Sequence, residues 1–485
     1  MSCEILPRSI VRRASLAAAS RALCTLALLL SLAGFTAAAR ADDMRVPAYE
    51  RVQLPNGAVL LLMERHDVPL IAFSAVLRGG ALADSEERAG TASILAALLE
   101  KGAGERDALQ FAQALAAVGG VIETDASTES LSVGGSFLAR DQKLMVELLA
   151  DMLQRPKLLA TEFEALRARH VEFIRAAKDS DLAALTPIYG AAALFGSHPY
   201  GRSVQGSEAS LAALTHADIA TQYRQQIGAD RLILAVAGDF KTAQLKQLLT
   251  RAFGGWRKAE RPLPTLAQPA APTQRRVVLI DAPGSVQSYF WAGQLGVPRS
   301  DPRRATIDVV NALFGGRFTS MLNSELRVRT GLSYGASSRF ERLSTSGSWQ
   351  MGSFTRTETT VDAIDLALAT LEKLHAGSLE PRMLESGKAY VLGQYPLALE
   401  TADQWAYQLA LLEFYGLDRS YVDGYGGALR GVSLDQAKRI IDEVFPASDK
   451  LTLVVIGNAS AIRDGLRKYG PITEIKLSDP SFAAR

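Results

Sequence analysis

The order of apolar and polar residues predicts a chain in which strands and helices follow one another in two similar series. Near the start, residues 51–56 and 58–64 read as two strands around Asn56-Gly57, a dipeptide typical of tight hairpin turns. Residues 70–77 form a third apolar strand. Residues 90–103 then place leucines and isoleucine at helical spacing, so the pattern predicts a helix there.

The second series repeats the end of the first. Residues 215–227 predict a helix that is followed by an apolar strand and Gly238, and residues 433–445 predict the same sequence of elements before Gly457. A Pro-rich linker at residues 258–274 separates the two series. We therefore predict an α+β fold with two homologous α/β sandwich domains, residues 42–257 and 275–485, each with a mixed or antiparallel sheet and helices packed on it.

Residues 1–41 read as a signal peptide. Arginines precede an apolar run, and Ala39-Arg40-Ala41 offers a cleavage site before Asp42. The run is short for an uncleaved membrane anchor, which is the alternative. We therefore expect export, to the periplasm.

The composition argues against several other kinds of function. The chain is 48% hydrophobic and 21% charged, as in globular proteins, and its net charge of +2 suggests neither nucleic acid nor a membrane surface as a partner. Both cysteines, Cys3 and Cys24, lie in the signal peptide, so the mature chain has no thiol nucleophile or cysteine zinc site. No two of its five histidines stand at a short metal-ligand spacing. These histidines are His66, His170, His198, His216 and His375.

The helix at residues 90–103, GTASILAALLEKGA, resembles the zinc helix G-x-A-H-x-x-E-H-x-x-x-K-G of insulinase- and pitrilysin-like metallopeptidases, which include the mitochondrial processing peptidases. In this alignment Ser93 stands at the first zinc histidine, Ala96 at the general-base glutamate and Ala97 at the second zinc histidine. Further motifs of the family follow in order: Leu54-Pro55-Asn56-Gly57, His198-Pro199-Tyr200-Gly201, Ala235-Val236-Ala237-Gly238-Asp239, Gly315-Gly316, Glu325-Leu326-Arg327 and Gly331-Leu332-Ser333-Tyr334-Gly335.

The resemblance implies a fold that forms one half of a clam-shell-like chamber for peptides. It also implies that this helix has lost the side chains that bind zinc and act as general base. A hydroxyl and two methyl groups cannot hold zinc or accept a proton from bound water. The family's third ligand, a glutamate, falls near Phe173, where Glu172 is either a remnant or a solvated helix residue. We expect no metal in this chain and zinc on a partner subunit.

Two other features of the family are retained. Arg327 and Tyr334 match an arginine and a tyrosine that approach the peptide carbonyl in active members, and Arg329 is the competitor if the register differs. Both side chains can donate hydrogen bonds to a carbonyl oxygen as negative charge develops on it. The family's substrate-binding edge strand corresponds to the candidates Thr124, Asp125, Ala126, Ser127 and Thr128, although an ordinary edge strand is an equal reading.

Together these features resemble the zinc-lacking subunit of bacterial heterodimeric members. The resemblance implies a non-catalytic subunit that is inactive alone, binds peptide or unfolded polypeptide, and supplies Arg327 and Tyr334 to a zinc-bearing homologous partner. One rival is a peptide-binding or scaffold protein without protease activity. Another is a peptidase with an unrecognised metal site, which the scattered histidines argue against.

Overall fold

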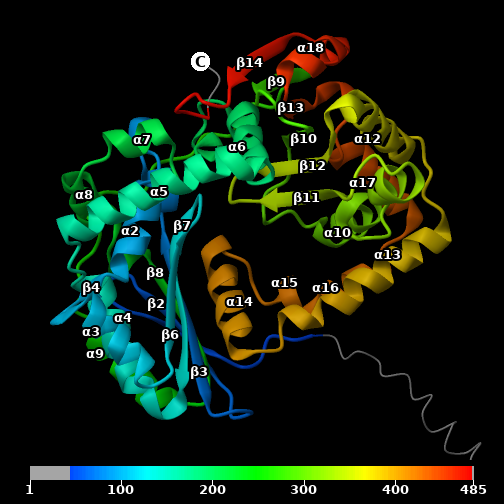
Figure 1. Ribbon diagram of the computed structural model, residues 1–485. Coiled ribbons are helices and arrows are strands. Elements are labelled where there is room, and N and C mark those ends of the chain that lie inside the picture. Colours follow the sequence, from blue (N-terminus) through cyan, green and yellow to red (C-terminus); the bar gives the residue numbers. More distant parts are fainter. Residues whose placement is uncertain (1–43, 483–485) are drawn as a thin grey trace, which may run out of the picture. The chain divides into compact units, whose positions relative to one another are not determined.

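Two six-stranded sheets form the framework of the protein in the computed structural model, which describes residues 44–482 (Figure 1). The elements of the first half are β1 Glu50–Gln53, β2 Val59–Glu64, β3 Leu70–Arg78, α2 Thr91–Leu99, β4 Gly102–Ala103, β5 Arg106–Asp107, α3 Ala108–Ala116, β6 Val121–Ala126, β7 Ser130–Leu138, α4 Gln142–Gln154, α5 Ala160–Ser180, α6 Leu182–Phe195, α7 Glu208–Ala213, α8 His216–Gln226, β8 Leu232–Gly238 and α9 Thr242–Phe253.

The second half begins after residues 258–274, which contain no helix or strand. Its elements are β9 Arg276–Asp281, β10 Gln287–Leu295, α10 Arg304–Asn311, α11 Met321–Asn323, β11 Ala336–Arg342, β12 Gly347–Arg356, α12 Thr360–His375, α13 Pro381–Gln394, α14 Ala402–Tyr415, α15 Ser420–Asp423, α16 Tyr425–Gly431, α17 Leu434–Val444, β13 Thr452–Gly457, α18 Ala459–Leu466 and β14 Ile472–Lys476. Two segments, Ala312–Gly316 and Ser324–Arg329, are π-helical.

The two sheets have equivalent topologies. Their strand orders are β6-β7-β3-β8-β2-β1 and β11-β12-β10-β13-β9-β14. In each sheet the strand at the centre, β8 or β13, follows a helix that was predicted from the repeated pattern, α8 or α17. Only the last edge differs, because β1 is antiparallel to β2 whereas β14 is parallel to β9. The predicted α+β fold with two related domains is therefore confirmed.

Each half contributes one helix to the sheet of the other. Helix α14 packs on β3 and β8 of the first sheet, and α6 packs on β10 and β13 of the second (Figure 1). Because both faces of the central strands are covered in this way, β8 is buried along its entire length. The exchange makes the apolar cores of the two halves interdependent.

The hairpin turns of the two sheets meet at a buried carboxylate. Glu129, between β6 and β7, accepts hydrogen bonds from the Tyr200 hydroxyl at 2.7 Å and from the Ser344 amide at 3.0 Å. Tyr415 of α14 donates to the same carboxylate at 3.2 Å. Burial and this carboxylate raise the pKa of Tyr200 to about 12, so its hydroxyl remains a donor.

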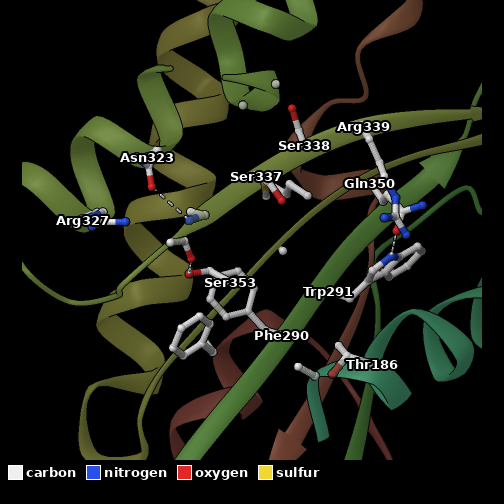
Figure 2. A pocket seen from close by; sticks show the side chains of 18 of the residues that line it. Thr186, Phe290, Trp291, Asn323, Arg327, Ser337, Ser338, Arg339, Gln350 and Ser353 are labelled. Carbon is white, nitrogen blue, oxygen red and sulfur yellow. Dashed lines mark hydrogen bonds between the residues drawn. The ribbon is translucent and has the colours of Figure 1, made fainter. Parts of the chain in front are cut away.

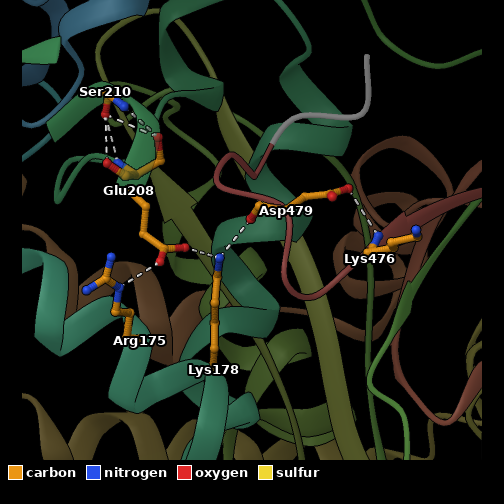
Figure 3. A network of polar contacts seen from close by, with 7 residues as sticks. Arg175, Lys178, Glu208, Ser210, Lys476 and Asp479 are labelled. Atoms are coloured by element: carbon orange, nitrogen blue, oxygen red, sulfur yellow. Dashed lines mark hydrogen bonds and ion pairs between the residues drawn. The ribbon is translucent and has the colours of Figure 1, made fainter. Parts of the chain in front are cut away.

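The C-terminal segment after β14 returns to the first half. Lys178 of α5 donates to the Asp479 carbonyl at 2.7 Å and forms an ion pair with Glu208 of α7 (Figure 3). The Phe482 ring meets Tyr189 of α6 edge-on, with 5.1 Å between ring centroids. This segment therefore ties α5, α6 and α7 to the end of the second half.

Several local expectations need revision. The helix predicted over residues 90–103 ends at Leu99, and Gly102 already belongs to the short strand β4. The candidate substrate strand was expected to include Ser127 and Thr128, but β6 ends at Ala126 and both residues lie in the turn between β6 and β7.

The predicted signal peptide lies outside the described residues. Among the helices of residues 44–482, none has the length and apolar character that a bilayer span requires.

Candidate functional site

Helix α2 begins at a position that only glycine suits. Gly90 has a φ of 98°, and a Cβ there would lie 3.0 Å from the Gln205 carbonyl oxygen and from Leu211. The buried Asp84 carboxylate accepts hydrogen bonds from the amides of Gly90 and Ala92, each at 3.1 Å. Burial raises the pKa of Asp84 to about 7 despite these two donors. Contacts with Asp84, Gln205 and Leu211 thus fix the position of the first turn of α2.

The face of α2 that carries Ser93, which the motif aligns with a zinc histidine, is covered by neighbouring side chains. The Ser93 hydroxyl donates to Gln205 Oε1 at 3.0 Å, and His170 Nε2 lies 3.4 Å from Ser93 Oγ. Because His170 Nδ1 is 2.9 Å from the Leu166 carbonyl, which can only accept, Nδ1 carries the proton of the neutral ring. Burial lowers the pKa of His170, which favours that neutral form.

The residues at this face do not fit a zinc ion. Ala96 and Ala97 have no donor side chains, and Glu172 points away: its side chain is 68% exposed and pairs with Arg175 at 2.7 Å. On α5 the buried residue one turn beyond His170 is Ile174, which also offers no ligand atom. Within residues 44–482 no group of three or more His, Cys, Asp or Glu side chains could hold a metal ion.

The candidate substrate strand β6 is an edge strand, as expected, but part of its free edge is occupied. The outward amide of Thr124 donates to Glu100 at 2.9 Å, and its hydroxyl donates to the Ala96 carbonyl at 2.8 Å. A peptide added at Thr124 would have to displace the Glu100 carboxylate. Of the other candidates, Ala126 is buried.

Asp125 and Ser127 face a cavity of about 590 Å³. Its walls come from β3, β6, β7 and α14, together with the end of β11. Four carboxylates line it, and within residues 44–482 none of them has a hydrogen-bond or ion-pair partner. We call this space the acidic cavity, after Glu123, Asp125, Glu341 and Asp403.

Arg327 and Tyr334 lie together, as the motif predicts. The Arg327 guanidinium carbon is 4.1 Å from the centroid of the Tyr334 ring, and Nη1 donates to the Tyr334 carbonyl at 2.8 Å. Gly331, with a φ of 65°, makes the turn that brings the two together. Tyr334 is 74% exposed, so its hydroxyl is accessible to another molecule.

The competitor Arg329 has a different environment. It forms an ion pair with Glu325 one turn earlier and contacts neither Tyr334 nor a large cavity. The geometry therefore supports Arg327 over Arg329 as the family's arginine.

Arg327 also lines a cavity of about 690 Å³ (Figure 2). Two further arginines line it, Arg317 and Arg339, and we call it the arginine cavity. Neither was predicted from the sequence. The alternation of β11 could have suggested which face Arg339 takes, but nothing in the sequence places Arg317 near it. Ser93, Ala96 and Ala97 line neither this cavity nor the acidic one.

Comparison with known proteins places these features in a family. Residues 64–208 match the family model "Insulinase (Peptidase family M16)", and residues 213–390 match "Peptidase M16 inactive domain". An uncharacterized zinc protease of Mycobacterium tuberculosis is 26% identical over 383 residues, 78% of this chain and 87% of that protein. The non-peptidase homolog YmxG of Helicobacter pylori is 21% identical over 398 residues, 81% of this chain and 90% of that protein.

Solved structures show the same fold. The crystal structure of a peptidase M16 inactive domain from Pseudomonas fluorescens matches with a TM-score of 0.79 at 21% identity, covering 84% of this chain and 98% of that one. The resemblance predicted from the motifs is therefore confirmed.

Proposed function

Because the chain belongs to the insulinase family of metallopeptidases (M16) and has Ser93, Ala96 and Ala97 in its zinc motif, we propose that it is the non-catalytic subunit of a two-chain peptidase. The chain itself is an inactive homologue of the family's enzymes. Its partner is a homologous subunit with an intact zinc helix, and the substrate is a peptide or an unfolded polypeptide.

The observation that carries this proposal is the contrast between the two halves. In the first half, the face of α2 is filled by Gln205 and His170. In the second half, Arg327 is held against an exposed Tyr334 and has no carboxylate partner within residues 44–482. A guanidinium and a phenol presented in this way can serve a reaction only if another chain supplies the rest of the site.

In the complex, Arg327 and Tyr334 have one chemical task. They donate hydrogen bonds to the peptide carbonyl oxygen as negative charge develops on it, which stabilises the transition state more than the bound substrate. A zinc ion held by the partner's intact helix would supply the activated water. The Tyr334 ring also limits the orientations of the guanidinium before substrate binds.

Export completes the proposal. The signal-like segment ends at Ala41, and the mature chain beginning near Asp42 would meet its partner in the periplasm.

Reconstitution tests the proposal. A pull-down with the tagged mature chain from its native host is expected to recover a homologue with an intact H-x-x-E-H helix, and peptide turnover is expected only when both chains are present. Purified alone, the chain is expected to hold no stoichiometric zinc. About one tightly bound zinc per chain, with peptidase activity that a chelator removes, would contradict the proposal.

A further inference from the structure

The arginine cavity has charge of one sign only. Among the described residues that line it are Arg317, Arg327 and Arg339, but no Asp, Glu, Lys or His. Its walls are the faces of β10, β11 and β12, one turn of α6 at Thr186, and the π-helical segment before Arg317 (Figure 2).

None of the three guanidinium groups is neutralised. Arg317 Nη1 donates to the carbonyl and hydroxyl of Ser386, while its buried Nε has no partner in the described part of the chain. Within residues 44–482 the Arg327 guanidinium donates only to the Tyr334 carbonyl, and the Arg339 side chain has no hydrogen bond or ion pair.

The acidic residue next to Arg327 in the π-helical segment is engaged elsewhere. Glu325 pairs with Arg329 and Lys373. The three arginines therefore concentrate positive charge in a partly enclosed space, where an anionic ligand would gain charge-assisted hydrogen bonds.

Six aromatic residues also line the cavity, among small and uncharged polar residues. They are Tyr289, Phe290, Trp291, Phe318, Phe354 and Tyr390. These rings favour a ligand that has an apolar part beside its anionic groups. A small inorganic anion would leave most of a 690 Å³ space unfilled.

Strand β11 indicates that the ligand is extended. Residues 336–339 line the arginine cavity and residues 340–342 line the acidic cavity, so one strand of about 23 Å runs past both. An extended polypeptide can follow such a path, whereas a compact phosphate compound cannot.

We propose that the arginine cavity binds acidic segments of the polypeptide substrate, with Arg317 and Arg339 contacting Asp or Glu side chains and the neighbouring rings contacting adjacent apolar residues. This inference rests on the proposed function, because it assumes that the ligand is a peptide. It adds the substrate class: sequences in which carboxylates stand beside aromatic or aliphatic residues.

Peptide binding to the mature chain alone tests the inference without any partner. Three fluorescent ten-residue peptides of equal length and aromatic content would be compared, with two Glu, two Gln or two Lys at the same positions. The Glu peptide is expected to bind at least tenfold more tightly than the Gln peptide at low salt, and this preference should shrink as salt is raised.

Variants identify the site. Arg317→Gln with Arg339→Gln is expected to abolish the preference for Glu over Gln, since glutamine stays polar but carries no charge. Arg251→Gln, on the surface of α9 and outside both cavities, is the matched control and should retain the preference. Circular dichroism melting shows whether the variants remain folded.

Different failures have different meanings. Equal binding of the Glu and Gln peptides, or a preference that survives in the double variant, would overturn the inference and leave peptide binding intact. Inorganic phosphate binding to the wild type more tightly than the Glu peptide does would also overturn it. No binding of any of the three peptides would overturn both this inference and the peptide-binding part of the proposed function.

Discussion

Ser93, Ala96 and Ala97, which the motif aligns with the zinc site, carry no zinc-binding group, and the polar groups around them have hydrogen-bond partners. Ser93 is engaged by Gln205, and the Ala96 carbonyl accepts a hydrogen bond from Thr124. A buried polar group without a hydrogen-bond partner would destabilise the fold. Here the polar groups have partners, which is consistent with a helix kept for its place in the core.

Asp84 gives this helix a measurable dependence on pH. Its pKa rises from 3.8 in an unfolded chain to about 7 in the fold, mainly because it is buried. Between these pH values the folded state holds a proton on Asp84 that the unfolded state has lost. The contribution of this proton to the free energy of unfolding is therefore complete below about pH 4 and is lost as the pH rises to about 7.

We expect the Asp84→Asn variant to lose this dependence, because the amide keeps an acceptor oxygen for the amides of Gly90 and Ala92. Its free energy of unfolding relative to wild type should increase between pH 4 and pH 8, by up to about 4 kcal/mol. Urea unfolding across this range provides the measurement. Curves for the two proteins that stay parallel throughout would contradict the expectation.

At the scale of elements, the sequence predicted turns and contacts correctly where they depend on residues close together in the chain. The turn at Asn56-Gly57 joins β1 and β2 as predicted, since Gly57 has the positive φ of 99° that the dipeptide favours. Arg327 and Tyr334 meet because they are close in sequence, with the end of the π-helical segment and the turn at Gly331 between them.

Predictions failed where distant contacts decide. Helix α6 continues through Pro187, although proline disfavours a helix interior, and this helix packs on β10 and β13 of the other half. Hydrophobic periodicity shows which face of a helix is buried, but it does not show which element that face packs against. The exchange of α6 and α14 between the sheets could therefore not be predicted from it. For the same reason Arg317 and Arg339 were not recognised as parts of one cavity.

At the scale of the whole molecule, the C-terminal segment provides a separate link between the halves. Lys178 is only 10% exposed, and its ammonium group joins Glu208 to the Asp479 carbonyl (Figure 3). The Ala209 amide donates to the Pro480 carbonyl at 2.9 Å in the same region. The segment depends on α5 and α7 for its position.

Lys178→Met should therefore destabilise the protein by about 2 kcal/mol, because Glu208 keeps only Arg175 and the Asp479 carbonyl loses its donor. Amide hydrogen exchange at Ala209 should become faster. Arg467→Gln, which removes an exposed pair with Asp464, is the control and should change stability by less than about 0.5 kcal/mol. Unfolding and exchange indistinguishable from wild type in Lys178→Met would mean that the segment is not held by this contact.

The central claim is that one active site is completed by two chains. It is tested most directly by titrating the zinc-bearing partner with this chain and following peptide turnover. Turnover should rise to a plateau at one chain per partner. At the plateau, Arg327→Ala should lower kcat by about a hundred- to thousand-fold, the effect of losing one oxyanion donor, while the concentration at half-saturation stays the same. Partner activity that is unchanged by this chain, or an Arg327→Ala plateau equal to that of wild type, would contradict the account.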